Sequence, residues 1–368
     1  MQGTIPEFPR RKSLLAKIQK KAKFTLFLAF FACFAASAPI EAQPQGLLYD
    51  DEHDFQAEPL RGGGSAIITR YRGRRQVVRI PSQIQGMPVT GIGAEAFQGR
   101  TLASVTIPGS VTTIGSHAFA WNNLTGITIP DNVTTIGDGA FRGNFLAGAN
   151  IGRSVTIIGS DAFRGNRLEN IIIPSGVTVI GNDAFRGNHL ESIIIPDSVT
   201  TIGDNAFRAN RLASVSIPGS VSVIGAQAFY SNQLDSVIIP QGVTAIGDNA
   251  FRRNKLASVV IPDSVTAIGD AAFFENRLTS IVIPTGVTTI GAQAFRRNFL
   301  TSVTIGSNVE TIGGMAFFEN QLTNITIGAN VRLNSTSFDN NFHIFYNNNG
   351  HRAGLYTWDG RTWTFSES

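Results

Sequence analysis

A single 22-residue unit, repeated along the chain, determines the fold; one copy reads Phe251-Arg-Arg-Asn-Lys-Leu256-Ala-Ser-Val-Val-Ile261-Pro-Asp-Ser-Val265-Thr-Ala-Ile268-Gly269-Asp-Ala-Ala272. Its Phe recurs with a strict period of 22 from Phe97 to Phe317, in eleven copies. Leu follows five residues after each Phe, Ile ten after, Val fourteen after, and an Ile-Gly pair precedes the next copy. A fixed period of this length indicates stacked repeats, because one unit alone cannot bury its apolar face.

Each part of the unit has a physical role. Val259 and Ile261 alternate with their neighbours, which predicts a short strand with one buried face, and Pro262 ends it because it has no N–H to donate. Residues 265–268 predict a second short extended stretch, and Gly269 a turn that a side chain would obstruct. Residues 270–273 predict a helical turn whose first residue, usually Asp, Asn or Ser, is its N-cap.

An Asn recurs three residues after each Phe, from Asn122 to Asn320. Two interpretations are open at this position. The amides could form a polar recognition stripe, or they could form an internal ladder that satisfies backbone groups otherwise buried without a partner. We favour the internal ladder, because a binding stripe would tolerate variation and these positions have none.

The unit Leu-x-x-Val/Ile-x-Ile-Pro-x-x-Val-x-x-Ile-Gly-x-x-Ala-Phe-x-x-Asn resembles the BspA-like leucine-rich repeats of bacterial surface proteins, over about residues 78–338. In many members of that family a Cys stands where this chain has the Asn. The resemblance implies a β-rich α/β solenoid of the leucine-rich-repeat type. In that solenoid, 22-residue repeats stack with a parallel β-sheet on one face and short helical turns on the other. Both ends are capped. It also implies adhesion to host or matrix proteins, or to other cells, without naming a ligand.

Residues 1–42 are expected to be a signal peptide. A basic segment precedes an apolar run of 15 residues, 24–38, which is too short for a membrane span and suits an export signal. Cys33 is the only cysteine. It is either a lipidation site that anchors the mature chain or an ordinary apolar residue of a leader cleaved after Ala38 or Ala42, and both alternatives stay open. The chain is thus expected to be exported, to the cell surface or outer membrane or as a secreted protein, with membrane contact only through the leader or a lipid.

The rest divides into four predicted segments. Residues 43–54 are an acidic spacer, and residues 55–93 an N-terminal hairpin cap with an irregular first repeat. Residues 94–338 form the solenoid of about eleven repeats. Residues 339–368 form a C-terminal aromatic hairpin cap with an Asp-Gly turn. Trp358 and Trp363 are expected to belong to this cap, with a ligand platform as the less favoured interpretation.

The composition argues against catalysis and nucleic-acid binding. The formal net charge of +4 becomes −2 when residues 1–32 are left out, so the basicity belongs to the leader. None of the five His residues has metal-ligand spacing from another His or from the Cys, and no nucleophile motif or phosphate-binding loop occurs. We expect no enzyme activity, no cofactor, no metal and no nucleic-acid partner.

Two variable columns inside the repeat are candidate ligand-binding surfaces. Nine residues after each Phe, the outward strand position becomes apolar in the middle copies: Ile172, Ile194, Ile238, Val260 and Val282. Directly after each Phe lies a second column, which includes Arg164, Arg186, Arg208, Tyr230 and Arg252. The competing interpretations are β-propensity on a partly shielded face for the first column and pairing with Asp of adjacent turns, such as Asp204 or Asp248, for the second.

The sequence therefore predicts an exported, adhesin-like cell-surface protein that recognises an extracellular protein or glycan through a face of the solenoid. The alternative is a structural envelope or cell–cell packing protein without a soluble ligand. Binding of a polyanion through the Arg column is a third, minor interpretation.

Overall fold

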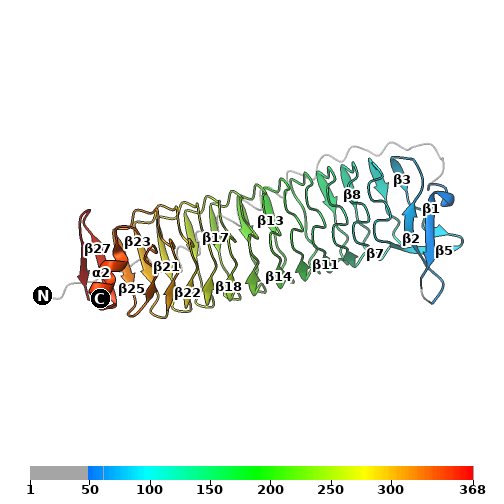
Figure 1. The fold of residues 1–368 in the computed structure, drawn as a ribbon. Helices are drawn as coiled ribbons and strands as arrows, with labels where there is room; N and C mark the ends of the chain where they lie inside the picture. Colours follow the sequence, from blue (N-terminus) through cyan, green and yellow to red (C-terminus); the bar gives the residue numbers. More distant parts are fainter. Residues whose placement is uncertain (1–48, 61, 368) are drawn as a thin grey trace, which may run out of the picture. The chain divides into compact units, whose positions relative to one another are not determined.

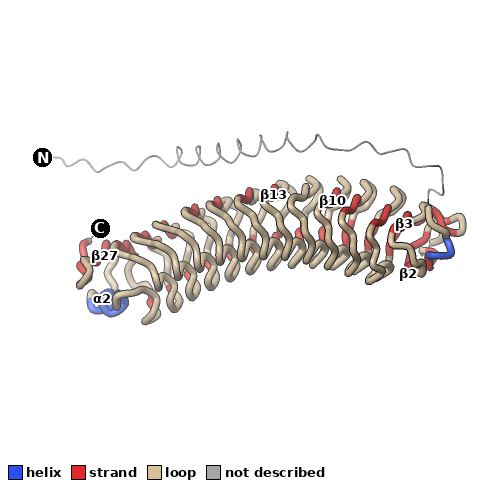
Figure 2. Tube along the Cα trace, turned by 90° about the horizontal axis from the view of Figure 1, so that it is seen from above, coloured by secondary structure: helices blue, strands red, loops and turns tan. Residues whose placement is uncertain are grey.

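The structure is a computed structural model that describes residues 49–60 and 62–367. The predicted signal peptide, Cys33 and the beginning of the predicted acidic spacer lie outside the described residues. Tyr49–Ser368 form one compact unit. Within this unit the repeats stack into a long, gently curved solenoid, in which each turn contacts the turns before and after it (Figures 1 and 2).

The N-terminal end of the unit is a small cap built on a β-hairpin. β1 pairs antiparallel with β2, and β2 then pairs parallel with β5, which begins the regular stacking. β4 pairs antiparallel with β5. The elements of this end are η1 (Glu52–Asp54), β1 (Phe55–Pro59), β2 (Ala66–Tyr71), β3 (Val77–Arg79), β4 (Gln83–Ile84) and β5 (Met87–Ile92).

Every regular repeat contributes a two-residue strand that ends at the Ile of its Ile-Gly pair. These strands join β1, β2, β4 and β5 in one fifteen-stranded sheet along one side of the solenoid, and from β5 to β26 neighbouring strands are parallel and in register (Figure 1). The two-residue strands are β7 (Thr113–Ile114), β9 (Thr135–Ile136), β11 (Ile157–Ile158), β12 (Val179–Ile180), β14 (Thr201–Ile202), β16 (Val223–Ile224), β18 (Ala245–Ile246), β20 (Ala267–Ile268), β22 (Thr289–Ile290), β24 (Thr311–Ile312) and β26 (Arg332–Leu333).

The strands predicted before each Pro form the second column, on a different side of the solenoid. They are parallel but make short separate sheets of two strands each, except at the C-terminal end, and residues 170–173 are not in a strand. The longer strands are β6 (Ser104–Thr106), β8 (Gly126–Thr128), β10 (Gly148–Asn150), β13 (Ser192–Ile194), β15 (Ser214–Ser216), β17 (Ser236–Ile238), β19 (Ser258–Val260), β21 (Ser280–Ile283), β23 (Ser302–Ile305) and β25 (Asn324–Ile327).

The repeated Phe residues form the centre of the core. From Phe97 to Phe338, neighbouring rings are stacked with centroids 4.9–5.5 Å apart. Tyr71 continues the stack at the N-terminal end, and Phe342 meets it edge-on at the C-terminal end. Since each buried Phe contributes about 1.5–3 kcal/mol, this ladder is a large part of what holds the repeats together. The predicted leucine-rich-repeat solenoid is confirmed.

The Gly of each Ile-Gly pair is required by the close approach of the preceding repeat. A Cβ on Gly269 would lie 2.7 Å from the backbone nitrogen of Asp248 and 2.8 Å from the carbonyl carbon of Gly247. Real Cβ atoms essentially never approach so closely, so a side chain here would push adjacent repeats apart.

The segments after the Ile-Gly pairs differ from the predicted helical turns, since they are tight turns without helix. Two residues per turn, the second before and the second after each Phe, are left-handed, as in Asp183 (φ 56°) and Arg253 (φ 56°). Such residues interrupt a right-handed helix. The expected N-cap side chains bond across repeats instead: the Asp204 carboxylate accepts from the backbone N–H of Ala226 at 2.7 Å.

The C-terminal end is closed by aromatic residues. α2 (Phe342–Asn348) is followed by a hairpin of β27 (Gly354–Trp358) and β28 (Trp363–Ser366), and β27 pairs antiparallel with β25. Trp363 is buried and packs edge-on against Phe342, and its indole N–H donates to the carbonyl of Asn340 at 3.1 Å. Trp363 is therefore part of the core of this end and offers no open platform.

Candidate binding surfaces

The Asn ladder lies inside the solenoid and is not a recognition stripe. The side-chain N–H₂ of Asn188 donates to the carbonyls of Phe163 (2.9 Å) and Phe185 (3.0 Å), and its Oδ1 accepts from the N–H of Leu168 (3.1 Å). The same three bonds recur along the array, and the residues from Asn122 to Asn298 are buried. Each amide joins two repeats, so the internal interpretation is confirmed.

The outward strand column is exposed, as expected. Ile172, Ile194, Val260 and Val282 are 69%, 46%, 41% and 56% exposed, and Ile238 is half-buried. They occupy the same position in successive repeats, and Ile194, Ile238 and Val260 end the strands β13, β17 and β19. Equivalent positions nearer the two ends hold exposed polar residues, such as Thr128 and Thr304. The apolar side chains thus mark the middle of this face. We call these five residues the outer strand column.

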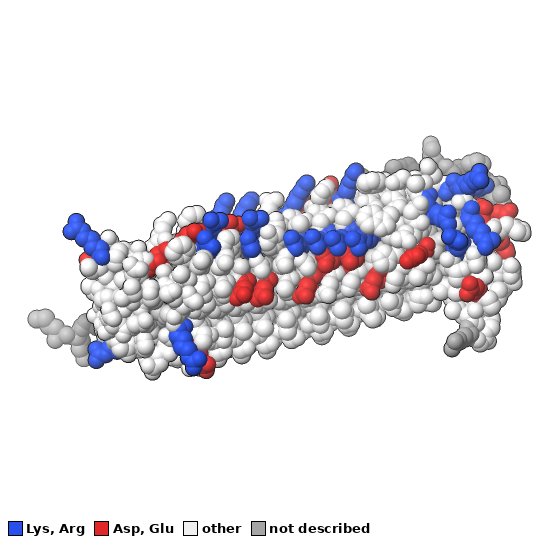
Figure 3. Space-filling model, viewed as in Figure 1, with Lys and Arg blue, Asp and Glu red and all other residues white. Residues whose placement is uncertain are grey.

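The column after each Phe is only partly exposed and is largely occupied with partners inside the protein. Arg164 and Arg186 each hold an Asp three residues earlier, with N–O distances of 2.8 Å to Asp161 and Asp183. Figure 3 shows a row of cationic side chains along the solenoid with acidic side chains beside it. Arginines of this column thus do pair with Asp residues, as the second interpretation expected. The partners are not Asp204 and Asp248, because the carboxylates of these two residues accept from the backbone N–H groups of Ala226 and Asp270.

Further along, the same column alternates cations with aromatic rings. The guanidinium of Arg208 lies 4.7 Å from the ring centroid of Tyr230, and that of Arg252 lies 4.5 Å from that of Phe274. Arg208 also donates to Asn205 (3.1 Å) and Gln227, and Arg252 to Asn249 (3.0 Å). These contacts hold the guanidinium groups against the solenoid, which leaves them poorly placed to capture an anionic ligand.

Two charged features were not singled out from the sequence. One is an ion ladder in which Glu275 bridges Arg253 (2.7 Å) and Arg297 (3.0 Å), while Glu319 contacts Arg297 and Arg296. The other is the run Arg70-Tyr-Arg-Gly-Arg-Arg75 in the N-terminal cap, whose guanidinium groups have few partners. The arginine run could have been found in the sequence as a local cluster of Arg. It does not stand out in the net charge, because the neighbouring acidic residues offset it.

Within residues 49–60 and 62–367, no group of three or more His, Cys, Asp or Glu side chains is arranged to hold a metal ion. The same residues include no helix that is long and apolar enough to cross a membrane.

These repeats define a leucine-rich-repeat solenoid. The family described as "BspA type leucine rich repeat region" matches this chain over residues 90–214, 143–256 and 222–344, and the chain belongs to this family. No curated protein matches the sequence.

Solved structures support the same assignment. A leucine-rich repeat protein of Bacteroides ovatus is 25% identical, with a TM-score of 0.55 and 76% of each chain covered. A leucine rich cell surface protein of Faecalibacterium prausnitzii is 28% identical, with a TM-score of 0.50, covering 77% of this chain and 96% of its own. The pneumococcal vaccine antigen PcpA has the same fold at 16% identity, with a TM-score of 0.52 and coverage of 83% and 97%.

Proposed function

We propose that the protein is an exported, adhesin-like cell-surface protein that binds an extracellular protein through the outer strand column. The observation that carries the proposal is the exposure of β-branched apolar side chains at one repeated position, flanked by polar residues at the same position in the outer repeats. Exposed apolar side chains gathered on one face are typical of interaction sites, and in this column Ser216 lies between Ile194 and Ile238. The family supports the surface location, since a relative is itself described as a cell surface protein.

The anchoring of individual side chains of the column also supports binding. Except at Ile172, which is not in a strand, the side chains of the column alternate with core-facing ones on the same strand, such as Ile193 between Ser192 and Ile194, so the backbone beneath them is anchored in the core. A preorganised apolar surface loses little conformational entropy when a partner covers it. Solenoids of this type are typically non-enzymatic interaction scaffolds, which agrees with the lack of a catalytic motif in the sequence.

The chain supplies its own conservative substitution for a test. Thr occupies this position in several repeats, so changing Ile172, Ile194, Val260 and Val282 together to Thr keeps the β-branched shape and removes the apolar surface. The full chain and this fourfold variant are compared for binding to immobilised fibronectin, laminin and collagen at low and high salt. The matched control changes Thr128 and Thr304 to Ser.

We expect the unmodified chain to bind at both salt concentrations and the Thr128→Ser/Thr304→Ser control to bind equally well. The fourfold variant should bind at least tenfold more weakly, because it loses several apolar contacts worth about 0.8 kcal/mol per buried CH₂. Equal binding by both proteins would exclude the column as the site. If the unmodified chain binds none of the three proteins but self-associates in analytical ultracentrifugation, and the fourfold variant does not, the structural cell–cell packing role replaces ligand binding.

A further inference from the structure

We propose a second binding site, for a linear acidic polysaccharide, on the arginines of the N-terminal cap. The site consists of Arg70, Arg72, Arg74 and Arg75, which we call the cap arginines. All four are exposed, and they fall within six consecutive residues at the end of β2. Five residue steps span at most about 18 Å, so four guanidinium groups are concentrated on a small surface. Figure 3 shows basic side chains gathered at this end of the solenoid.

The cap arginines differ from the arginines of the column after each Phe in how few side-chain partners they have. Within the part of the chain that the structure describes, the side chains of Arg70 and Arg74 have no hydrogen-bond or ion-pair partner, and the guanidinium of Arg72 donates only to the neutral Oε1 of Gln56, at 2.8 Å. Arg164 and Arg186, in contrast, each pair with an Asp. Anion-binding capacity is therefore found in the cap, not in the column after each Phe.

The fourth arginine is held in place by a buried carboxylate. Arg75 Nη1 lies 2.8 Å from Asp50 Oδ1, and the side chain of Asp50 is only 5% exposed while that of Arg75 is 64% exposed. Asp50 also accepts from the backbone N–H of Arg79 at 2.9 Å through its other oxygen. The guanidinium of Arg75 is thus fixed along one edge, and its remaining donors face solvent.

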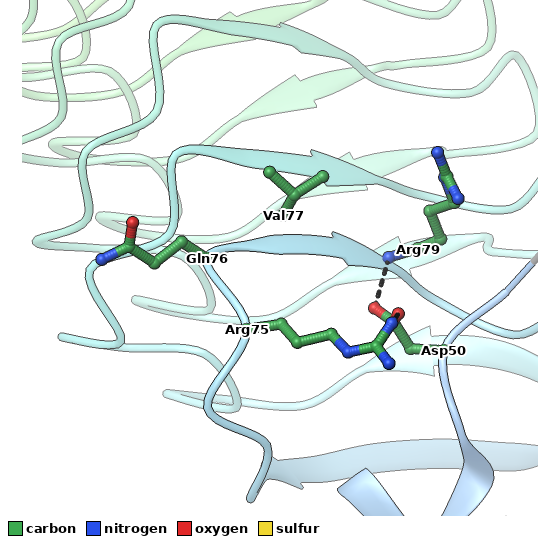
Figure 4. Close-up of a pocket in the computed structure, with 5 residues that line it drawn as sticks. All are labelled: Asp50, Arg75, Gln76, Val77 and Arg79. Carbon is green, nitrogen blue, oxygen red and sulfur yellow. Dashed lines mark hydrogen bonds and ion pairs between the residues drawn. The ribbon is translucent and has the colours of Figure 1, made fainter. Parts of the chain in front are cut away.

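A shallow recess of about 440 Å³ adjoins this arginine (Figure 4). It is lined by Asp50, Arg75, Gln76, Val77 and Arg79. Val77 is exposed between Arg75 and Arg79 and provides an apolar floor next to the cation. A sugar ring has both apolar C–H faces and anionic substituents, so this combination of surfaces suits it.

The loop that carries the arginines is anchored. Tyr71 is fully buried, and its hydroxyl donates to the carbonyl of Arg75 at 3.4 Å. Gly73 lies so close to the Tyr71 ring that a Cβ would come within 2.4 Å of the hydroxyl oxygen, and the N–H of Arg72 donates to the carbonyl of Asp54 at 2.7 Å. A fixed loop presents its charges without a large entropic cost on binding.

The acidic residues of the cap select the shape of the ligand. The Asp51 carboxylate is hydrogen-bonded to His53, and the Glu52 carboxylate accepts from the backbone N–H of Gln85 at 2.9 Å. Both carboxylates are thus fixed in the same N-terminal cap as the arginines. A broad anionic surface would meet these carboxylates together with the arginines, whereas a linear chain covers less of this end and so meets less of their negative charge. Guanidinium groups pair bidentately with carboxylate and with oxyanions such as sulfate, the charges that acidic polysaccharides carry.

Single-stranded nucleic acid fits less well. Its recognition depends on exposed aromatic rings on which bases stack, and the only ring in this loop, that of Tyr71, is buried.

The test uses the full chain purified in detergent and two probes, heparin and alginate, which carry sulfate and carboxylate groups. The site variant is R70Q/R74Q/R75Q. The matched control is R164Q/R186Q/R252Q, which removes the same charge from the solenoid. Both are first checked for unchanged thermal unfolding, and a single R74Q variant is measured as well, because the exposed side chain of Arg74 forms no hydrogen bond or ion pair within the described residues.

We expect binding to at least one probe that weakens steeply with salt, falls about tenfold or more in the site variant and changes less than twofold in the control. R74Q alone should weaken binding by a smaller, measurable factor. Equal losses in the two triple variants, or no binding to either probe at low salt, would overturn the proposal. So would a single-stranded DNA of matched charge that competes as well as the polysaccharide, since the site would then be a general polyanion site. The outer strand column is intact in every variant, so this result is independent of the proposed protein-binding function.

Discussion

The side-chain amide nitrogen of Asn210 lies 2.9 Å from the carbonyl oxygen of Phe185, a residue 25 positions earlier and in the preceding repeat. The same amide donates to the carbonyl of Phe207 in its own repeat at 3.1 Å and accepts from the N–H of Leu190 at 3.1 Å. One side chain therefore satisfies three buried backbone groups from two repeats. The amide therefore joins adjacent repeats through their backbones, beside the contact that the stacked Phe rings make between the same repeats.

Replacement of Asn210 by Ala should destabilise the protein by about 3 kcal/mol, because three buried backbone groups lose their partner at about 1–3 kcal/mol each and water recovers part of the loss. Urea unfolding followed by circular dichroism measures the change. The control is Asn170→Ala, at an exposed position outside the ladder, which should stay within about 0.5 kcal/mol. A loss for Asn210→Ala as small as that of the control would contradict the bridging role.

Gly225→Ala should destabilise the protein by about 1–3 kcal/mol through overpacking. Its Cβ would lie 2.7 Å from the carbonyl carbon of Gly203 and 2.8 Å from the nitrogen of Asp204, both of which are backbone atoms that cannot move aside. Gly219→Ala is the matched control, since no atom lies within 4 Å of its added Cβ. Thermal unfolding of the two variants should separate clearly. Identical melting temperatures would show that the repeats tolerate a wider spacing.

Ala209→Gly should leave the protein as stable as the unmodified chain or slightly more stable, against the usual direction for such a change. Ala209 has φ 55°, a left-handed conformation that costs an L-residue about 1–2 kcal/mol. A Gly at this position removes that cost and adds a smaller entropic cost of folding, about 0.4–1 kcal/mol. The equivalent residues Gly165 and Gly187 are already Gly. Ala213→Gly, at an exposed position without positive φ, should destabilise, and the prediction fails if both variants destabilise equally.

The ion ladder should make stability fall in acid. Partial burial raises the pKa of Glu275, but hydrogen bonds from Arg253 and Arg297 outweigh it and hold the pKa below its usual 4.5; bonds from Arg296 and Arg297 lower the pKa of Glu319. A carboxylate with a lowered pKa stabilises the folded state above the unfolded pKa, and that contribution is lost as pH falls through the folded pKa.

The urea midpoint of the unmodified chain should therefore drop more between about pH 6 and pH 3 than that of E275Q/E319Q, which lacks both titrating groups. Because the two proteins share all other acids, the difference between the two pH profiles isolates the ladder. Parallel profiles would mean that these pairs do not contribute to stability.

Most of the fold could be predicted from the 22-residue period, because a residue that recurs at every 22nd position must occupy the same environment in every turn. For this reason the burial of Phe207 and Asn210 could be predicted from the sequence. The conformation of the turns could not, since Asp, Asn and Gln are as compatible with a left-handed turn residue as with a helix start, and the two differ in φ at positions such as Asp183.

The hydrogen-bond and ion-pair partners of the charged side chains could not be predicted from the sequence either. Asp204 stands where an N-cap would be expected, and its bond to Ala226 depends on the distance between adjacent repeats, which the sequence does not state. α2 was missed for a different reason. Its residues, Phe342–Asn348, are rich in Asn and aromatic side chains of modest helix propensity, and the helix is stabilised by burial of Phe342 and Tyr346 in the aromatic end of the core.

The two strand columns differ in continuity, and this has a mechanical consequence. The two-residue strands form one uninterrupted hydrogen-bonded sheet, whereas the longer strands before β21 form separate pairs, and residues 170–173 are in no strand. A rod built this way is stiff along one side and compliant along the other. Force applied between its ends would open this side at the breaks between the short sheets, one of which contains Ile172, and so alter the spacing of the outer strand column before any repeat unfolds.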